Sequence, residues 1–161
     1  MNVVVMSDTH MPGRSRRLPR ALVAELERAD LIVHAGDFST AEVLADLREL
    51  GPVTAVHGNV DSPALRQELP ESISLELENV VLGVIHDAGP ARGRLERLRT
   101  RFPDADAVVF GHSHRPYRAR LGRVLLFNPG SAGPRRFSLP RTVGLLRLAP
   151  DRIDARIVHL D

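Results

Sequence analysis

The chain has 161 residues, of which 43% are hydrophobic and 26% charged, and its formal net charge is +2. These values are typical of a globular protein and exclude a disordered, collagen-like or coiled-coil chain. The length allows one hydrophobic core, so we expect a single domain over residues 1–161. No apolar run approaches the roughly 20 residues of a membrane-spanning helix, so we expect no contact with a membrane.

The absence of cysteine narrows the possible chemistry and indicates a cellular compartment. Without cysteine the chain has no disulfide, no thiolate nucleophile and no cysteine-ligated zinc. Residues 1–5 carry no basic segment and begin an apolar run at once, so we expect no secretory signal. Together these features favour a cytoplasmic protein.

The basic residues are unusual because all 22 are arginine, which gives a pI near 10.2 despite the small net charge. A surface that attracts a polyanionic substrate and ordinary solvated helix faces are both compatible with this composition. The small net charge favours the second interpretation. The arginines concentrate in two clusters, at Arg14, Arg16, Arg17 and Arg20 and at Arg92, Arg94, Arg97, Arg99 and Arg101.

The first part of the chain alternates short apolar runs with amphipathic segments at helical spacing. The runs predict buried strands, and the segments predict helices. One helix is expected to begin at a capping box formed by Ser39 and Glu42 and to end at Gly51. A short helical turn is expected at Ser62-Pro63. The predicted strands are 2–6, 31–33 and 53–56, and a further helix is predicted at about 18–29.

The second part of the chain is mostly strand. Ile73, Leu75 and Leu77 alternate with polar residues, and a turn at Glu78-Asn79 leads into 80–85, which predicts a hairpin. We expect this hairpin to expose apolar side chains and to allow a homodimer. A helix is predicted near 95–102, with further strands at 107–110, 116–121, 124–127, 142–148 and 152–159. The order predicts an α/β protein with a largely parallel sheet and a second, more antiparallel sheet.

Five short polar motifs each follow a predicted strand. Ligands in α/β proteins bind beyond the carboxyl ends of strands, so five such loops can bring their side chains together. Glycine before Asp37, Asn59 and His112 is expected to let the backbone turn sharply. The motifs are Asp8-Thr9-His10, Gly36-Asp37, Gly58-Asn59-Val60-Asp61, His86-Asp87 and Gly111-His112-Ser113-His114.

These motifs supply a set of metal ligands that contains oxygen and nitrogen but no sulfur. Such a set suits Mn, Fe, Co, Ni or Zn better than Ca or Mg, which prefer oxygen alone. Seven ligands exceed the needs of one tetrahedral ion, and a shared carboxylate would give each of two ions four protein ligands. The seven candidates are Asp8, His10, Asp37, Asn59, His86, His112 and His114.

The order D-x-H, G-D, G-N-x-D, H, G-H-x-H resembles the signature of the calcineurin-like metallophosphoesterases. The short length and the segment LLFNPGSAGPRR are similar to the small phosphodiesterases of the YfcE type. The resemblance implies two packed mixed β-sheets flanked by helices. It also implies that one ion is held by Asp8, His10 and His114, that a second is held by Asn59, His86 and His112, and that Asp37 bridges both.

The same resemblance implies hydrolysis of phosphate esters by a hydroxide that bridges two divalent ions, with Mn expected and Fe, Ni, Co or Zn as alternatives. Asp37, Asn59 and His112 are the expected catalytic residues. Asn59, His57 and Arg135 are the expected substrate contacts. The expected substrate is a small phosphodiester or a nucleotide-like compound.

The sequence departs from the family pattern at two positions. Larger phosphatases of this superfamily have a histidine that acts as general acid where this chain has Val60, so we expect it to prefer diesters or activated esters. Asp87 stands where the family more often has glycine. Asp61 and Asp87 are each interpreted as a partner of a ligand or as a turn residue, and His34 as a core residue or a ligand's partner.

Two other functions compete with hydrolysis. The chain could be a protein-interaction scaffold resembling the retromer subunit Vps29, but a scaffold would be expected to have lost ligands, and all seven are present. A nuclease is the third possibility. One tyrosine and no tryptophan offer few surfaces on which bases could stack, so nucleic acid is not an expected partner.

Overall fold

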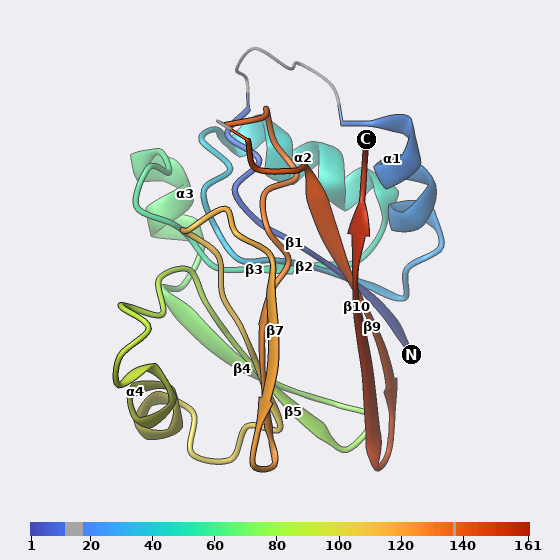
Figure 1. Cartoon of the computed structure of the whole chain (residues 1–161). Helices are drawn as coiled ribbons and strands as arrows, with labels where there is room; N and C mark the ends of the chain where they lie inside the picture. The colour runs from blue at the N-terminus through green and yellow to red at the C-terminus, as the bar shows by residue number, and fades with distance from the viewer. Residues whose placement is uncertain (12–17, 137) are drawn as a thin grey trace.

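The computed structural model describes residues 1–11, 18–136 and 138–161. Two five-stranded sheets pack face to face, and helices lie on their outer sides (Figure 1). The expected fold of two packed mixed sheets flanked by helices is therefore confirmed. Three members of the first arginine cluster, Arg14, Arg16 and Arg17, lie outside the described residues.

The first sheet has the strand order β10-β9-β1-β2-β3. Its strands β1, β2 and β3 are parallel, whereas β9 pairs antiparallel with β1 and β10 pairs antiparallel with β9. The strands are β1 (Asn2–Met6), β2 (Leu31–His34), β3 (Val53–Ala55), β9 (Thr142–Ala149) and β10 (Arg152–His159).

The second sheet has the order β4-β5-β6-β8-β7. Its inner strands β5, β6 and β8 are parallel, and its edge strands β4 and β7 are antiparallel to their neighbours. The division into one largely parallel and one more antiparallel sheet is therefore wrong, because each sheet combines two parallel and two antiparallel strand pairs. The strands are β4 (Ser72–Leu77), β5 (Val80–Ile85), β6 (Ala107–Val109), β7 (Tyr117–Leu121) and β8 (Val124–Asn128).

The helices form the two outer layers. α1 (Arg20–Glu27), α2 (Ala41–Leu50) and α3 (Pro63–Glu68) contribute buried leucines to the core on the outer face of the first sheet. α4 (Arg94–Arg101) packs on the outer face of the second sheet through Leu98. None of the helices in the described part of the chain is long and apolar enough to cross a bilayer.

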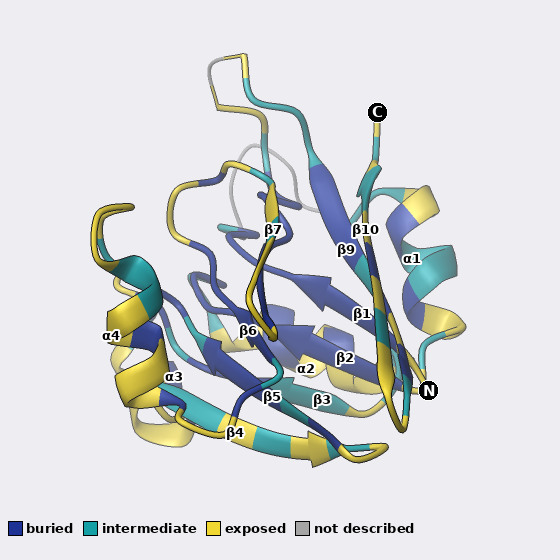
Figure 2. Cartoon of the chain, turned by 60° about the horizontal axis from the view of Figure 1, so that its bottom comes forward, coloured by how far each residue is buried: buried dark blue, intermediate teal, exposed yellow. Residues whose placement is uncertain are grey.

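The core lies in three layers because the central strands are buried on both faces (Figure 2). In β1, Val3 and Val5 point into the space between the sheets, whereas Val4 and Met6 point toward the helices. The inner layer joins both sheets through residues such as Phe127. Burial on both faces explains why these strands appear in the sequence as unbroken apolar runs.

The expected capping box at the start of α2 is wrong. The residue that precedes the helix is Thr40, and no side chain caps the first turn. Ser39 has a φ of 84°, and its N–H donates to Asp61 Oδ1 at 2.9 Å. Ser39 therefore belongs to the loop that follows β2. The helical turn expected at Ser62-Pro63 is present, and Ser62 Oγ accepts a hydrogen bond from the Leu65 N–H at 3.4 Å.

The hairpin of β4 and β5 forms as predicted, but its apolar side chains are not exposed. Ile73 and Leu77 pack against the layer between the sheets, and the exposed positions of β4 are Ser74 and Glu76. Glu78 and Asn79 both have a positive φ, as a two-residue turn of type I′ requires. The surface proposed for a homodimer is therefore missing, and dimerisation stays a prediction without this support.

Candidate metal centre

The carboxyl ends of five strands meet at one edge of the two sheets. Loops that follow β1, β2, β3, β5 and β6 bring all seven predicted ligands together there. Six of them form two groups in which the candidate ligand atoms lie within 4.8 Å of one another. The groups are Asp8, His10 and His114, and Asp37, His86 and His112, with Asn59 in contact with the second.

The first group is centred on a carboxylate oxygen that has no hydrogen bond. Asp8 Oδ1 is buried and unpartnered, and it lies 3.6 Å from His10 Nε2 and 3.4 Å from His114 Nε2. The two imidazole nitrogens are 3.2 Å apart. The other oxygen, Asp8 Oδ2, accepts hydrogen bonds from Ser7 Oγ at 2.7 Å and the His112 N–H at 3.0 Å. Oδ1 is thereby oriented toward the imidazoles.

The second group is centred on the amide oxygen of Asn59. This Oδ1 lies 3.0 Å from His86 Nε2 and 3.2 Å from His112 Nδ1. His86 Nε2 also lies 3.2 Å from Asp37 Oδ2. The far nitrogen, His86 Nδ1, lies 2.7 Å from the Ala35 carbonyl oxygen, to which it must donate because that oxygen can only accept.

Asp37 lies between the two groups. Its Oδ2 is 3.7 Å from His10 Nε2 in the first group and 3.2 Å from His86 Nε2 in the second. Its Oδ1 accepts a hydrogen bond from the Val60 N–H at 3.0 Å. Asp37 is therefore positioned to contribute to both groups.

The side-chain oxygen and nitrogen atoms of the site are suitable ligands for divalent cations. In neutral His86 the proton sits on Nδ1, so the lone pair of Nε2 faces the oxygens of Asn59 and Asp37. Acceptors that face one another repel unless a cation or a proton lies between them. Ligand atoms that share a first-row ion lie about 3.0–3.6 Å apart, given bonds of about 2.0–2.2 Å. The separations among these side chains are close to that range.

The backbone around the site is strained. Among non-glycine residues a positive φ is uncommon, and such residues cluster at functional sites. Five of the seven predicted ligands have one, with φ between 46° and 70°. The glycines play two different roles. Gly36 has a φ of 96°, but a Cβ on Gly58 would lie only 2.0 Å from Asp37 Oδ1, so Gly58 is required for space. The five ligands are Asp8, His10, Asp37, His112 and His114.

Asp61 joins two of the ligand loops. Its carboxylate accepts hydrogen bonds from the N–H groups of Asp37 at 3.0 Å, Ser39 at 2.9 Å and Gly58 at 2.6 Å. It therefore fixes the loop that carries Asp37 against the turn that carries Asn59. Of the two interpretations drawn from the sequence, the partner of a ligand is the one that describes Asp61. Asp87, in contrast, is exposed and accepts a hydrogen bond from the Gly89 N–H, as a turn residue does.

The charges of the site are coupled. Burial alone would raise the pKa of Asp8, but contacts with His10, His114 and Ser7 and the charge of His86 hold it below its usual range. Burial also opposes ionisation of Asp37, yet His86 and the Val60 N–H lower its pKa. Burial would lower the pKa of His86, and the two aspartates raise it instead. The site therefore favours anionic carboxylates that attract positive charge.

Two supporting residues were not assigned a role from the sequence. Ser7 orients Asp8, but a serine before an aspartate carries no specific signal. Thr9 Oγ1 lies 3.2 Å from Nε2 of His34. Nδ1 of His34 accepts the Gly36 N–H at 3.1 Å, so Nε2 carries the proton and donates it to Thr9. His34 stacks on Phe38 at 3.6 Å between centroids, and it connects the loops after β1 and β2.

His34 should make the protein sensitive to acid. Burial lowers its pKa from 6.5 to about 3, so the folded protein keeps it neutral while the unfolded chain takes up a proton below about pH 6.5. The free energy of unfolding therefore decreases as the pH is lowered. Between about pH 7.5 and pH 5, His34 should reduce it by about 2 kcal/mol. Urea unfolding of metal-free wild type and His34→Asn at both pH values measures it. The variant should lose less stability, and equal losses would contradict this account.

The predicted substrate contacts are placed differently from one another. His57 lines a pocket of about 210 Å³ together with Asn59 and His86. Arg135 instead forms an ion pair with Asp161, with 2.8 Å between Nη2 and Oδ2. Within the described residues no ion pair or hydrogen bond links Arg135 to the seven ligands. Its role as a substrate contact stays a prediction.

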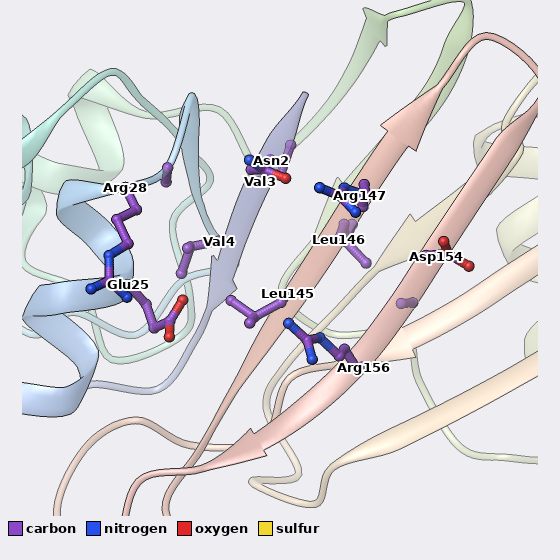
Figure 3. A pocket seen from close by; sticks show the side chains of 12 residues that line it. Asn2, Val3, Val4, Glu25, Arg28, Leu145, Leu146, Arg147, Asp154 and Arg156 are labelled. Atoms are coloured by element: carbon purple, nitrogen blue, oxygen red, sulfur yellow. The ribbon is translucent and has the colours of Figure 1, made fainter.

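A second cavity lies away from this edge. It has a volume of about 560 Å³ and is lined by residues of α1, the turn after α1, β1, β9 and β10, including Arg28, Leu145 and Arg156 (Figure 3). None of the seven predicted ligands lines it. The candidate centre is therefore defined by its polar side chains and not by the volume of a cavity.

Residues 1–151 match the calcineurin-like phosphoesterase superfamily domain. A protein of Methanothermobacter thermautotrophicus named "Probable metallophosphoesterase" is 36% identical, and the match covers 99% of this chain and 92% of that protein. The phosphodiesterase YfcE of Escherichia coli is 30% identical over 68% of this chain and 60% of its own length. Vps29 of Entamoeba histolytica complexed with Zn²⁺ has a TM-score of 0.79, with 22% identity over all of both chains.

The family match and the named relatives place the chain among the metallophosphoesterases. The chain belongs to the calcineurin-like phosphoesterase superfamily, and the resemblance seen in the order of the motifs is confirmed. The similarity to Vps29 concerns the fold alone.

Proposed function

We propose that this protein is a phosphodiesterase that acts with two divalent cations. Asp8, His10 and His114 would hold one ion, and Asn59, His86 and His112 would hold the other. Asp37 would contact both. Manganese is the expected ion, with Fe, Co, Ni and Zn as alternatives.

The observation that carries this proposal is the buried, unpartnered carboxylate oxygen of Asp8, beside a second group of converging ligand atoms. Asp8 Oδ1 is buried without a hydrogen bond and faces the imidazoles of His10 and His114. Asn59 Oδ1 faces two further imidazoles, those of His86 and His112. Buried polar atoms almost always have a partner, so an exception needs a specific explanation. One cation would satisfy Asp8 Oδ1, and a second would bind the exposed Asn59 Oδ1 together with the two imidazoles that it faces.

Two bound cations supply a water of lowered pKa and neutralise charge on the phosphoryl oxygens. The protein's own residues then orient the ester. The Asn59 amide can donate from Nδ2 to a phosphoryl oxygen while its Oδ1 faces the imidazoles. The exposed His112 can contact the same group. His57 lies in the adjoining pocket, where it can contact one ester group.

The leaving group sets the substrate class. Val60 is 47% exposed beside Asn59 and has no proton to donate. Esters whose leaving oxygen is already a weak base need no general acid, whereas alkyl monoesters do. Activated esters are therefore proposed as substrates, and small phosphodiesters are proposed because relatives of the chain are named phosphodiesterases. We also propose that the protein is cytoplasmic and that residues 1–161 act as a single domain.

Hydrolysis of a chromogenic diester tests the function. Protein stripped with a chelator should not hydrolyse bis(p-nitrophenyl) phosphate, and added Mn²⁺ should restore turnover. The diester should be preferred to an alkyl monoester such as glycerol phosphate. Absence of turnover with each of Mn²⁺, Fe²⁺, Co²⁺, Ni²⁺ and Zn²⁺ would contradict the proposal and favour a protein-interaction scaffold.

A further inference from the structure

We propose that Arg66 is a positioning residue for the half of the metal centre that contains Asn59. The inference rests on the proposed function, because it assumes that the two groups of ligands bind cations. Arg66 lies on α3, and its guanidinium binds the turn between β3 and α3. Its Nε–H donates to the Asp61 carbonyl oxygen at 3.1 Å, and Nη2–H donates to the Asn59 carbonyl oxygen.

This turn supplies the centre with more than the Asn59 side chain. Its Val60 N–H donates to Asp37 Oδ1 at 3.0 Å, and the Asp61 carboxylate accepts the N–H groups of Asp37 and Gly58. Asn59 and Val60 are themselves exposed. In the described residues, the hydrogen bonds to the carbonyl groups of Asn59 and Asp61 both come from Arg66. One planar guanidinium therefore fixes the exposed side of the turn.

The helix that carries Arg66 is anchored in the core. Leu65, the neighbour of Arg66 in α3, is fully buried in the core under the first sheet, and Leu69 packs in the same cluster. The two hydrogen bonds from the guanidinium therefore hold the turn at a fixed position relative to α3. Substitution of a residue that orients a metal ligand through a hydrogen bond typically lowers metal affinity 10- to 100-fold.

Geometry, and not charge, explains the effect expected from Arg66. A positive charge near a cation site would weaken cation binding by repulsion, so a benefit has to come from the two hydrogen bonds. Lysine would keep the charge but could not bind both carbonyl groups in one plane. Arg66→Lys and Arg66→Ala should therefore both impair the centre, which separates this role from electrostatic attraction.

Calorimetric titration with Mn²⁺ tests the inference on each ion site separately. In a His10→Ala background, which impairs the first group, Arg66→Ala should weaken the remaining site about 10- to 100-fold. In a His86→Ala background, the same change should weaken the remaining site clearly less, because that site is linked to the turn only through Asp37. Equal effects in the two backgrounds, or no effect in either, would overturn the inference.

A matched control is available on α2, at an arginine that contacts α3. Arg48 forms an ion pair with Glu68 of α3 at 2.6 Å and makes no described contact with the turn. Arg48→Ala should leave both Mn²⁺ sites within about twofold. Thermal unfolding of the metal-free variants checks that α3 remains folded, and Arg66→Lys, which keeps the length of the side chain, repeats the measurement if Arg66→Ala unfolds.

Kinetics distinguish positioning from direct binding of the substrate. With saturating Mn²⁺, Arg66→Ala should keep its KM for bis(p-nitrophenyl) phosphate within about twofold, and more Mn²⁺ should be needed to reach half of the maximal rate. A raised KM with unchanged Mn²⁺ affinity would show that Arg66 binds substrate and would overturn the inference. Wild type that binds fewer than two ions would instead refute the proposed function on which it rests.

Discussion

Asp37→Asn should reduce kcat/KM for a phosphodiester about 10²- to 10⁴-fold, which corresponds to a loss of about 3–5 kcal/mol of transition-state stabilisation. The side chain keeps its size and its acceptor for the Val60 N–H. It loses the negative charge that lies 3.2 Å from His86 Nε2 and 3.7 Å from His10 Nε2. The change therefore weakens both groups of ligands at once. Steady-state kinetics over a range of Mn²⁺ concentrations measures the loss.

Asp87→Asn is the control for this change. Asp87 follows His86 in the sequence but is exposed and bonds only within its own turn in the described residues. Because Asp87 has no hydrogen bond or ion pair with the seven ligands in the described residues, the Asp87→Asn variant should keep its Mn²⁺ affinity within about threefold. If Asp37→Asn behaved like this control, Asp37 would not be shared between two ions.

Val60→His should extend the activity to poorer leaving groups. Position 60 is exposed beside Asn59, so an imidazole fits there without disturbing the core. A positioned general acid contributes about 10²- to 10⁴-fold. Hydrolysis of phenyl phosphate, whose leaving phenol has a pKa of about 10 like that of tyrosine, should rise by about 10²-fold. Hydrolysis of p-nitrophenyl phosphate should change little.

Val60→Gln separates acid catalysis from a change in size or polarity. Glutamine approaches histidine in volume but cannot supply a proton at neutral pH. The rate for phenyl phosphate relative to p-nitrophenyl phosphate should rise in Val60→His and not in Val60→Gln. Equal behaviour of the two variants would show that the absence of an acid at position 60 does not determine the substrate class.

The sequence predicted the central strands and the convergence of the seven ligands for the same reason. Strands buried on both faces leave apolar runs, and the residues that follow them, such as Asp8 and His86, lie at one edge of the sheets. The assignment of each ligand to an ion came from the family resemblance, because no spacing along the chain determines which loops lie side by side. Asp37 and His10, for example, come together only through the pairing of β1 with β2.

Other features were not predictable because they depend on tertiary contacts. Ser39 and Glu42 have the spacing of a capping box, but Asp61 binds the Ser39 N–H and holds that residue at positive φ. The alternation in β4 was correct, yet which face is buried depends on the opposing sheet. Arg66 carried no recognisable signal, since its role lies in two hydrogen bonds to backbone carbonyl groups.

Anomalous diffraction from crystals of the Mn²⁺-loaded protein tests the shared role of Asp37 most directly. We expect two manganese peaks, both in contact with Asp37. One should also contact Asp8, His10 and His114, and the other Asn59, His86 and His112. A single peak at saturating Mn²⁺, or two peaks of which only one contacts Asp37, would contradict the account.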